Sequence, residues 1–113
     1  MRLIEEETIQ RAELFRRIMH ELIGEDVVKK NRKWSVSAAR AMVSYRLIEE
    51  GCKLLDVAQL MQRHHATILY HLEMVDNMLT SPGYKAEKEL FKKFKREINE
   101  YDKSKNRAFY NQA

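Results

Sequence analysis

Apolar residues recur every three or four positions along most of the chain, which is the spacing of amphipathic helices. Gly24 follows the first such stretch, residues 1–23, and suits the left-handed position that ends a helix. The stripe in that stretch consists of Leu3, Ile9, Leu14, Phe15, Ile18, Met19, Leu22 and Ile23. No alternating apolar–polar run of useful length occurs. The pattern therefore predicts an all-α chain.

Four later segments carry the same signature. Residues 38–50 have a broad apolar face and predict a long helix that ends at Gly51. Residues 53–61 predict a short amphipathic helix, and residues 65–79 predict a second one after a tight joint. Residues 84–110 predict a C-terminal helix whose apolar positions are Leu90, Phe91, Phe94, Ile98 and Tyr101. Together with the N-terminal helix these segments predict one compact domain over residues 1–113.

The joints between these helices are short, since the chain has only three glycines and one proline. Ser35 and Ser37 are candidate N-caps for the long helix. In the clearest break, "TSPG", Ser81 is expected to cap the last helix and Pro82 to occupy its first position. Residues 25–30 are compatible with one extra helical turn, so we expect a bundle of five to six helices.

Charge is distributed unevenly along the chain. The net charge is +4, with −3 over residues 1–28, +6 over 29–48, −3 over 49–80 and +4 over 81–113. The acid-free block contains Lys29, Lys30, Arg32, Lys33, Arg40 and Arg46. Its first part, residues 29–37, is expected to be a basic loop. Such a block is typical of proteins that bind a phosphate backbone, although a solvated basic face has the same composition.

Residues 53–79 read as a helix-turn-helix, because a short helix and a tight joint precede a second amphipathic helix. In that motif the N-terminal end of the second helix meets the base edges in the major groove. The residues at this end are Arg63, His64, His65, Ala66 and Thr67, whose types suit base or phosphate contact. His71 either reaches a phosphate or is a partly buried surface histidine. The joint has no glycine, which is one usual feature missing.

The stretch "RKWSVSAARAMVSYRLIEEGCKLLDVAQLMQRHHATILYHLEMV" resembles the C-terminal DNA-binding domain of the bacterial replication initiator DnaA. The family's joint reads Arg-Asp-His-Thr-Thr before a branched apolar residue, and here it reads "RHHATI". The resemblance covers roughly residues 8–100, with its core at 32–79. It implies a TrpR/DnaA-like helical fold that binds double-stranded DNA, with a role in replication or regulation.

Site residues carry over from this resemblance one position at a time. The family's recognition histidine falls on His65 and its second threonine on Thr67. Its minor-groove arginine falls on Arg32 and a phosphate-binding arginine on Arg40, in a register that is loose by one residue. His64 and Ala66 replace the family's aspartate and first threonine, so we expect a DNA site that differs from the usual initiator box.

The chain contains no glycine-rich phosphate loop, so the resemblance implies the DNA-reading module without an ATPase, as in a mobile-element or phage-like protein. We expect a monomer that binds double-stranded DNA. The hypothesis from another class is a module that docks a replication or transcription protein. Helix 65–79 or the C-terminal helix would form the docking surface.

Other functions find little support in the sequence. No His-x-x-x-His pair is present and Cys52 is the single cysteine, so we expect neither a metal site nor a disulfide. No nucleophile and base stand at a motif-like spacing, and we expect no catalysis and no cofactor. The absence of a long apolar run and of a signal-peptide pattern favours a cytoplasmic protein. Trp34 is expected to anchor the core or the loop.

Overall fold

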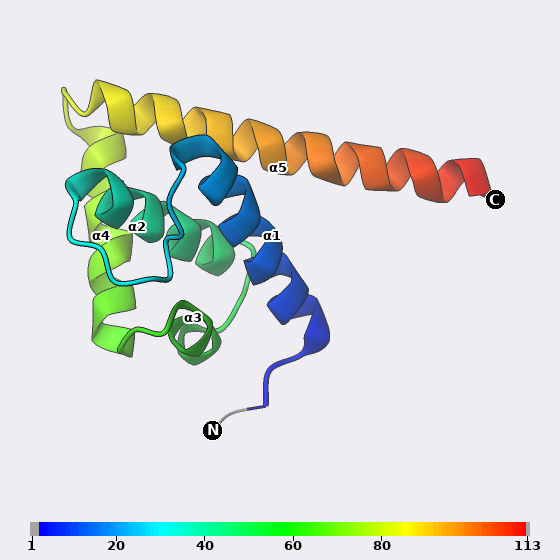
Figure 1. The fold of residues 1–113 in the computed structure, drawn as a ribbon, viewed down its shortest axis with the longest axis horizontal. Helices are drawn as coiled ribbons and strands as arrows, with labels where there is room; N and C mark the ends of the chain where they lie inside the picture. Colours follow the sequence, from blue (N-terminus) through cyan, green and yellow to red (C-terminus); the bar gives the residue numbers. More distant parts are fainter. Residues whose placement is uncertain (1–2, 113) are drawn as a thin grey trace.

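The computed structural model describes residues 3–112, with side chains through residue 106, and this part contains five helices and no strand. The helices are α1 (Glu6–Ile23), α2 (Trp34–Glu49), α3 (Leu54–Met61), α4 (His65–Thr80) and α5 (Lys85–Gln112) (Figure 1). The all-α prediction is therefore confirmed. Residues 25–30 form turns rather than a sixth helix.

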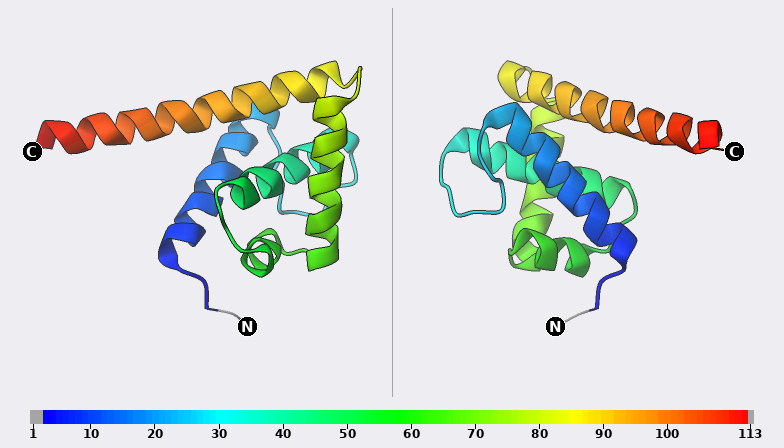
Figure 2. Two further views of the ribbon diagram at one scale, coloured as in Figure 1. Left: turned by 180° about the vertical axis from the view of Figure 1, so that it is seen from behind. Right: turned by 45° about the vertical axis from the view of Figure 1, so that its right-hand side comes forward.

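Helix α2 is the centre of the bundle and contacts each of the other four helices. Helix α4 packs across α2, and α3 packs near the beginning of α4 (Figures 1 and 2). Helix α5 lies along the opposite end of the bundle, where it contacts α1, α2 and α4, and its C-terminal end projects beyond them (Figure 2). The N-terminal end of α4 and helix α5 therefore lie on different sides of the molecule.

The core fills the space around α2. Phe15 of α1 and Phe94 of α5 meet edge to face, with ring centroids 5.5 Å apart. Phe91 and Ile98 are also buried, which confirms that the apolar stripe of α5 packs inward. The other fully buried large side chains are Met19, Met42, Leu47, Met61, Ile68 and Met78. Burial of this apolar surface is the main term that stabilises the bundle.

The predicted helix ends are right at two glycines. Gly24 has φ 77° and its N–H donates to the carbonyl of His20 at 2.8 Å, which ends α1. Gly51 has φ 95° and follows the end of α2. Both positions need positive φ, which glycine adopts without a steric penalty.

The predicted N-caps are wrong. Helix α2 begins at Trp34, so Ser35 and Ser37 lie inside its first turn. Ser81 ends α4 instead of capping α5, and Pro82 lies outside the helix that begins at Lys85. Ser81 and Pro82 do lie in a break, but Ser35 and Ser37 do not, so the predicted loop 29–37 ends at Lys33 and the long helix begins four residues earlier than predicted.

Candidate functional site

The joint between α3 and α4 is the tight turn that the sequence predicted. Gln62 adopts the left-handed conformation there, with φ 55° and ψ 45°. The backbone N–H of Arg63 then donates to the carbonyl of Ala58 at 2.9 Å and closes the end of α3. A left-handed residue with a Cβ costs roughly 1–2 kcal/mol. Gln62 thus does the work for which glycine is commonly used, and surrounding contacts must hold the turn.

His64 caps α4. Its Nδ1 accepts a hydrogen bond from the backbone N–H of Ala66 at 3.1 Å, so in the neutral ring the proton is on Nε2. The helix-capping part of the role that an aspartate would have is therefore performed by an imidazole. Because the N–H of Ala66 is already paired, it is not available to hold a phosphate.

The first turn of α4 presents polar groups to solvent. His64, His65 and Ala66 are exposed, while Thr67 is half-buried. The two imidazole rings lie side by side with centroids 4.2 Å apart. Ile68, one residue further on, is fully buried and fixes the helix against the core. Three of the five predicted reading residues are thus accessible at one helix end.

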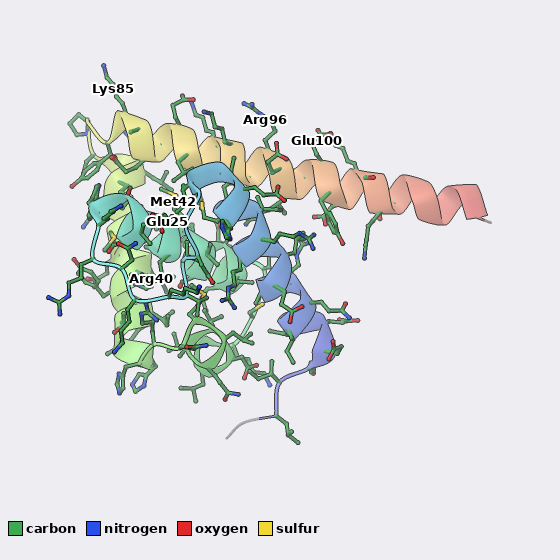
Figure 3. All side chains as sticks on the ribbon, in the orientation of Figure 1. Glu25, Arg40, Met42, Lys85, Arg96 and Glu100 are labelled. Carbon is green, nitrogen blue, oxygen red and sulfur yellow. The ribbon has the colours of Figure 1, made fainter. Side chains whose placement is uncertain are left out.

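Arg40 holds the loop that connects α1 to α2. This residue of α2 is only 6 % exposed, and Figure 3 shows it beside the loop. Its Nε donates to the carbonyl of Val27 at 2.6 Å, and its Nη2 donates to those of Lys29 and Asn31 at 3.1 and 3.2 Å. The guanidinium thus replaces the backbone partners that this irregular segment lacks.

Arg63 holds the same loop from the other side. Its Nη1 donates to the carbonyl of Val28 at 3.0 Å, and its Nη2 donates to that of Lys29 at 3.4 Å. Nη1 also contacts the carbonyls of Met61 and Gln62 in the joint, each at 3.1 Å. Arg63 therefore ties the basic loop to the turn that precedes α4.

The loop carries its charges outward. Lys29, Lys30, Arg32 and Lys33 are all exposed, and we call these four side chains the loop cations. Lys33 has an ion pair with Glu25 at 3.7 Å, but both side chains are largely exposed and such pairs contribute little. The loop cations and the exposed start of α4 are consequently parts of one edge of the molecule.

A buried histidine lies behind this edge. His71 is 4 % exposed, and its Nδ1 lies 3.2 Å from Oγ of Ser44. The same Ser44 hydroxyl lies 3.2 Å from the carbonyl of Arg40, so His71, Ser44 and the backbone of α2 are joined in one buried polar cluster. Burial, together with the positive charges of Arg40 and Arg63, lowers the pKa of His71 to about 4. His71 is therefore neutral at pH 7.

These contacts show which of the residues predicted to touch DNA have accessible side chains. Arg40 and His71 are buried, and Arg63 uses its guanidinium on backbone carbonyls. Arg46 lies near the far end of α2, where it pairs with Glu49 at 2.9 Å and Glu50 at 3.4 Å. We remove these four residues from the contact set. The contact set keeps the exposed residues Arg32, Lys33, His64, His65 and Ala66, and also Thr67, which is half-buried.

The exposed face of α4 becomes acidic and aromatic beyond its first turns. Glu73 and Asp76 are exposed on it, as is Tyr70. Trp34, expected in the core or as an anchor, is 49 % exposed and its ring lies 6.5 Å from that of Tyr84. The exposure of these rings was not predicted, although Trp34 directly follows a basic run in the sequence.

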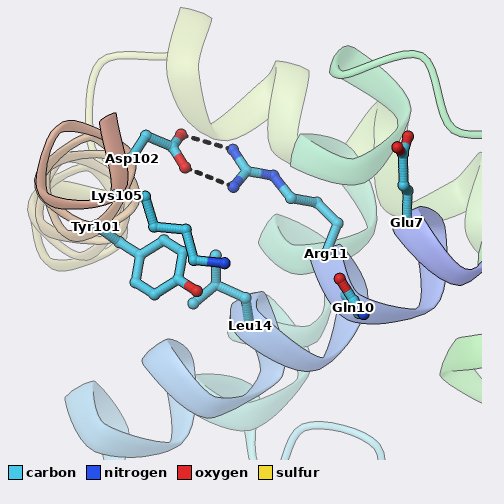
Figure 4. Close-up of a pocket in the computed structure, with 7 residues that line it drawn as sticks. All are labelled: Glu7, Gln10, Arg11, Leu14, Tyr101, Asp102 and Lys105. Atoms are coloured by element: carbon cyan, nitrogen blue, oxygen red, sulfur yellow. Dashed lines mark hydrogen bonds and ion pairs between the residues drawn. The ribbon is translucent and has the colours of Figure 1, made fainter. Parts of the chain in front are cut away.

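A second region of the surface is less suited to binding. A pocket of about 220 Å³ lies between α1 and α5, lined by residues that include Glu7, Arg11 and Tyr101 (Figure 4). Both nitrogens at the end of the Arg11 side chain donate to Asp102, at 2.7 and 2.8 Å, and Arg11 also bonds Glu50. The guanidinium of Arg11, the main cation of this pocket, is therefore paired with carboxylates of α5 and α2 and is not free to bind a ligand.

The described part of the chain holds neither a cluster of metal ligands nor a membrane-spanning helix. Among the residues that the structure describes, no three His, Cys, Asp or Glu side chains gather as metal ligands. Within residues 3–112, every helix is too short or too polar to cross a lipid bilayer.

Comparisons of the chain with protein-family models, with curated proteins and with solved structures gave no significant match. The resemblance to the DnaA domain therefore stays a prediction that rests on the residues of the joint and the basic block.

The buried imidazole predicts a specific acid sensitivity. In the unfolded chain a histidine titrates at its ordinary pKa near 6.5, whereas folded His71 titrates at about 4. Between these values the unfolded state binds a proton that the folded state does not, so stability falls as pH falls. We expect a loss of up to about 3 kcal/mol in the free energy of unfolding, measured by urea titrations from pH 7 to pH 4.

His71→Asn is the matched variant, because its amide can still form a hydrogen bond with Ser44 but cannot titrate. It should flatten this pH dependence even if it lowers stability overall. Asp26, whose pKa is lowered to about 2 by its hydrogen bond from Arg16, contributes stability that is lost only below about pH 4. An unchanged slope between pH 6.5 and 4 in the variant would show that His71 is not its source.

Proposed function

We propose that this protein binds double-stranded DNA through the loop cations and the N-terminal end of α4. The observation that carries the proposal is the pair of arginine clamps. Arg40 and Arg63 fix the basic loop beside the α3–α4 joint through carbonyls of residues 27–31. Four exposed cations and an exposed helix start therefore share a preorganised edge, as binding a duplex requires.

In this proposal the two parts have separate tasks. The loop cations neutralise phosphates and supply most of the affinity, which is therefore salt-dependent. His64 and His65 offer ring N–H donors to base edges, and the methyl group of Ala66 offers an apolar contact for thymine. Because Nδ1 of His64 is engaged in the cap, its Nε2–H is the group directed to DNA.

Acidic residues limit how much of α4 enters the groove. Glu73 and Asp76 lie on the exposed face two to three turns after His65. A carboxylate close to phosphates is repelled, so the helix is expected to meet the duplex with its first two turns. This end-on geometry is that of a recognition helix in a helix-turn-helix protein.

We further propose that the module is related to the DNA-binding domain of DnaA and acts in replication or its regulation. The support is the joint sequence together with the order of basic loop, long helix, short helix and reading helix. The caps differ, since an imidazole stands where the family has an aspartate. A sequence preference different from that of the family follows from this difference.

The test is fluorescence anisotropy of labelled random-sequence duplex at about 50 and 200 mM salt. We expect binding at low salt and at least a tenfold weaker affinity at high salt, because several phosphate contacts are involved. Selection for a preferred sequence and substitution of His64 and His65 would follow. A folded protein that binds no duplex at 50 mM salt would exclude the proposal.

A protein-docking function is the second candidate, favoured by exposed apolar side chains. Leu55 and Leu69 are 46 % and 48 % exposed on α3 and α4. An apolar helix surface of this kind suits a partner helix. Such docking would persist as salt rises, whereas duplex binding would not, so the same salt series distinguishes the two functions.

A further inference from the structure

Three exposed aromatic rings surround a hollow beside the basic loop. Trp34 of α2, Tyr70 of α4 and Tyr84 of the linker before α5 are 49 %, 59 % and 42 % exposed. The hollow between them has a volume of about 270 Å³, and we call it the aromatic hollow. Water-exposed rings gathered at one place are uncommon unless they contact something else, because apolar side chains are normally buried.

Two of the rings lie near each other without stacking face to face. Trp34 and Tyr84 are tilted by 40° with centroids 6.5 Å apart, so they are not stacked on each other. Tyr84 has φ 55°, an uncommon value for a bulky residue, and its side chain lines the hollow. Flat apolar groups can therefore stack on these rings.

Polar groups at the hollow come from one helix face. Glu73 and Asn77 line it from α4, four residues apart, and Met74 and Met78 supply the apolar part of its wall. A carboxylate accepts from the exocyclic amine of a base, and an amide can both donate to and accept from adenine. Aromatic faces with such groups beside them are the usual elements that bind an unpaired base.

The positive charge of the neighbouring loop indicates that a base would reach the hollow as part of a phosphate-bearing strand. The loop cations end at Lys33, and Trp34 is the next residue. Tyr70 lies five residues after His65, which is about 7.5 Å along the axis of α4. A strand that leaves a duplex at the start of α4 would cross this distance within about two or three nucleotides.

We propose that the aromatic hollow binds an unpaired nucleobase of a strand whose phosphates lie on the loop cations. The protein would then prefer a junction between duplex and single strand over a continuous duplex. This inference rests on the proposed DNA binding and adds a partner class to it. A peptide with an apolar side chain is the competing occupant, but the basic loop beside the hollow favours a phosphate-bearing ligand.

The chain contains one tryptophan, Trp34, so its intrinsic emission reports directly on the hollow. Three probes are compared at 50 mM salt: a blunt duplex, the same duplex with a four-adenine overhang at either end, and the same overhangs made abasic. We expect the adenine overhang to quench Trp34 and to bind roughly tenfold more tightly than the blunt duplex. The abasic overhang keeps the phosphates and should do neither.

Two variants separate stacking from general packing. Tyr70→Ala should lower the affinity for the adenine overhang by roughly five- to tenfold, toward that of the blunt duplex. Leu55→Ala removes another exposed apolar group, on α3 and outside the hollow, and should leave the preference for the overhang unchanged.

The outcomes are distinguishable. Equal affinity for all three duplexes with unchanged Trp34 emission would overturn the inference while DNA binding stands, and the hollow would be left to a protein partner. Quenching of Trp34 by the adenine overhang, with no binding of the blunt or the abasic duplex, would support the hollow and refute the proposed duplex function. No response of Trp34 and no binding to any probe would refute both.

Discussion

Replacing the four loop cations together with alanine is expected to weaken duplex binding on the order of 100-fold at 50 mM salt. The substitutions are Lys29→Ala, Lys30→Ala, Arg32→Ala and Lys33→Ala. Each lost phosphate contact removes one released counterion, so the slope of log affinity against log salt should also fall by about 3 to 4. Anisotropy over a salt series measures both quantities. Because all four side chains are exposed, thermal stability should change little.

The control removes the same charge elsewhere. Lys92, Lys93, Lys95 and Arg96 are exposed on α5, and Figure 3 shows Arg96 directed away from the body of the molecule. The quadruple alanine variant at these positions has the same net charge as the loop variant. It should keep the slope and lose only a small part of the affinity. If both variants weaken binding equally, the DNA contact is a diffuse effect of net charge rather than a property of the loop.

The arrangement of helices could be predicted because it follows from local periodicity. The sequence predicted a helix over residues 65–79, and α4 is His65–Thr80. The positions of Gly24 and Gly51 gave the ends of α1 and α2, since their backbones need positive φ. The serine caps were wrong because a serine near a helix start has several possible partners and only tertiary packing selects one.

The candidate site was predictable only where its residues face solvent. The sequence pattern around a basic residue is the same whether its side chain faces water or donates to a buried carbonyl. The backbone contacts of Arg40 and Arg63 could therefore not be predicted. One signal was available for His71. It lies three residues after Ile68 and four before Val75, both buried, and therefore belongs to the core stripe of α4. The aromatic hollow joins residues from α2, α4 and the linker before α5, which no local pattern brings together.

Arg40→Met is expected to lower the free energy of unfolding by about 2–3 kcal/mol. Methionine keeps most of the apolar stem but leaves the carbonyls of Val27, Lys29 and Asn31 without their charged donor. Hydrogen bonds to charged groups contribute roughly 1.5–3 kcal/mol each. Part of this is offset because the variant no longer buries a cation next to Arg63, whose charge, together with burial, lowers the pKa of Arg40. Urea unfolding monitored by circular dichroism measures the difference.

Arg46→Met is the matched control, since it makes the same change near the other end of α2. Its ion pairs with Glu49 and Glu50 are near the surface, so the expected loss is below about 1 kcal/mol. Only Arg40→Met should speed amide hydrogen exchange in residues 27–33 and raise the pKa of His71 from about 4, because one of the positive charges that lower it is gone. Duplex affinity should fall with the freed loop even at temperatures where the variant is fully folded. Unchanged loop exchange would mean that Arg63 alone fixes the loop, and the two-arginine clamp would then be wrong.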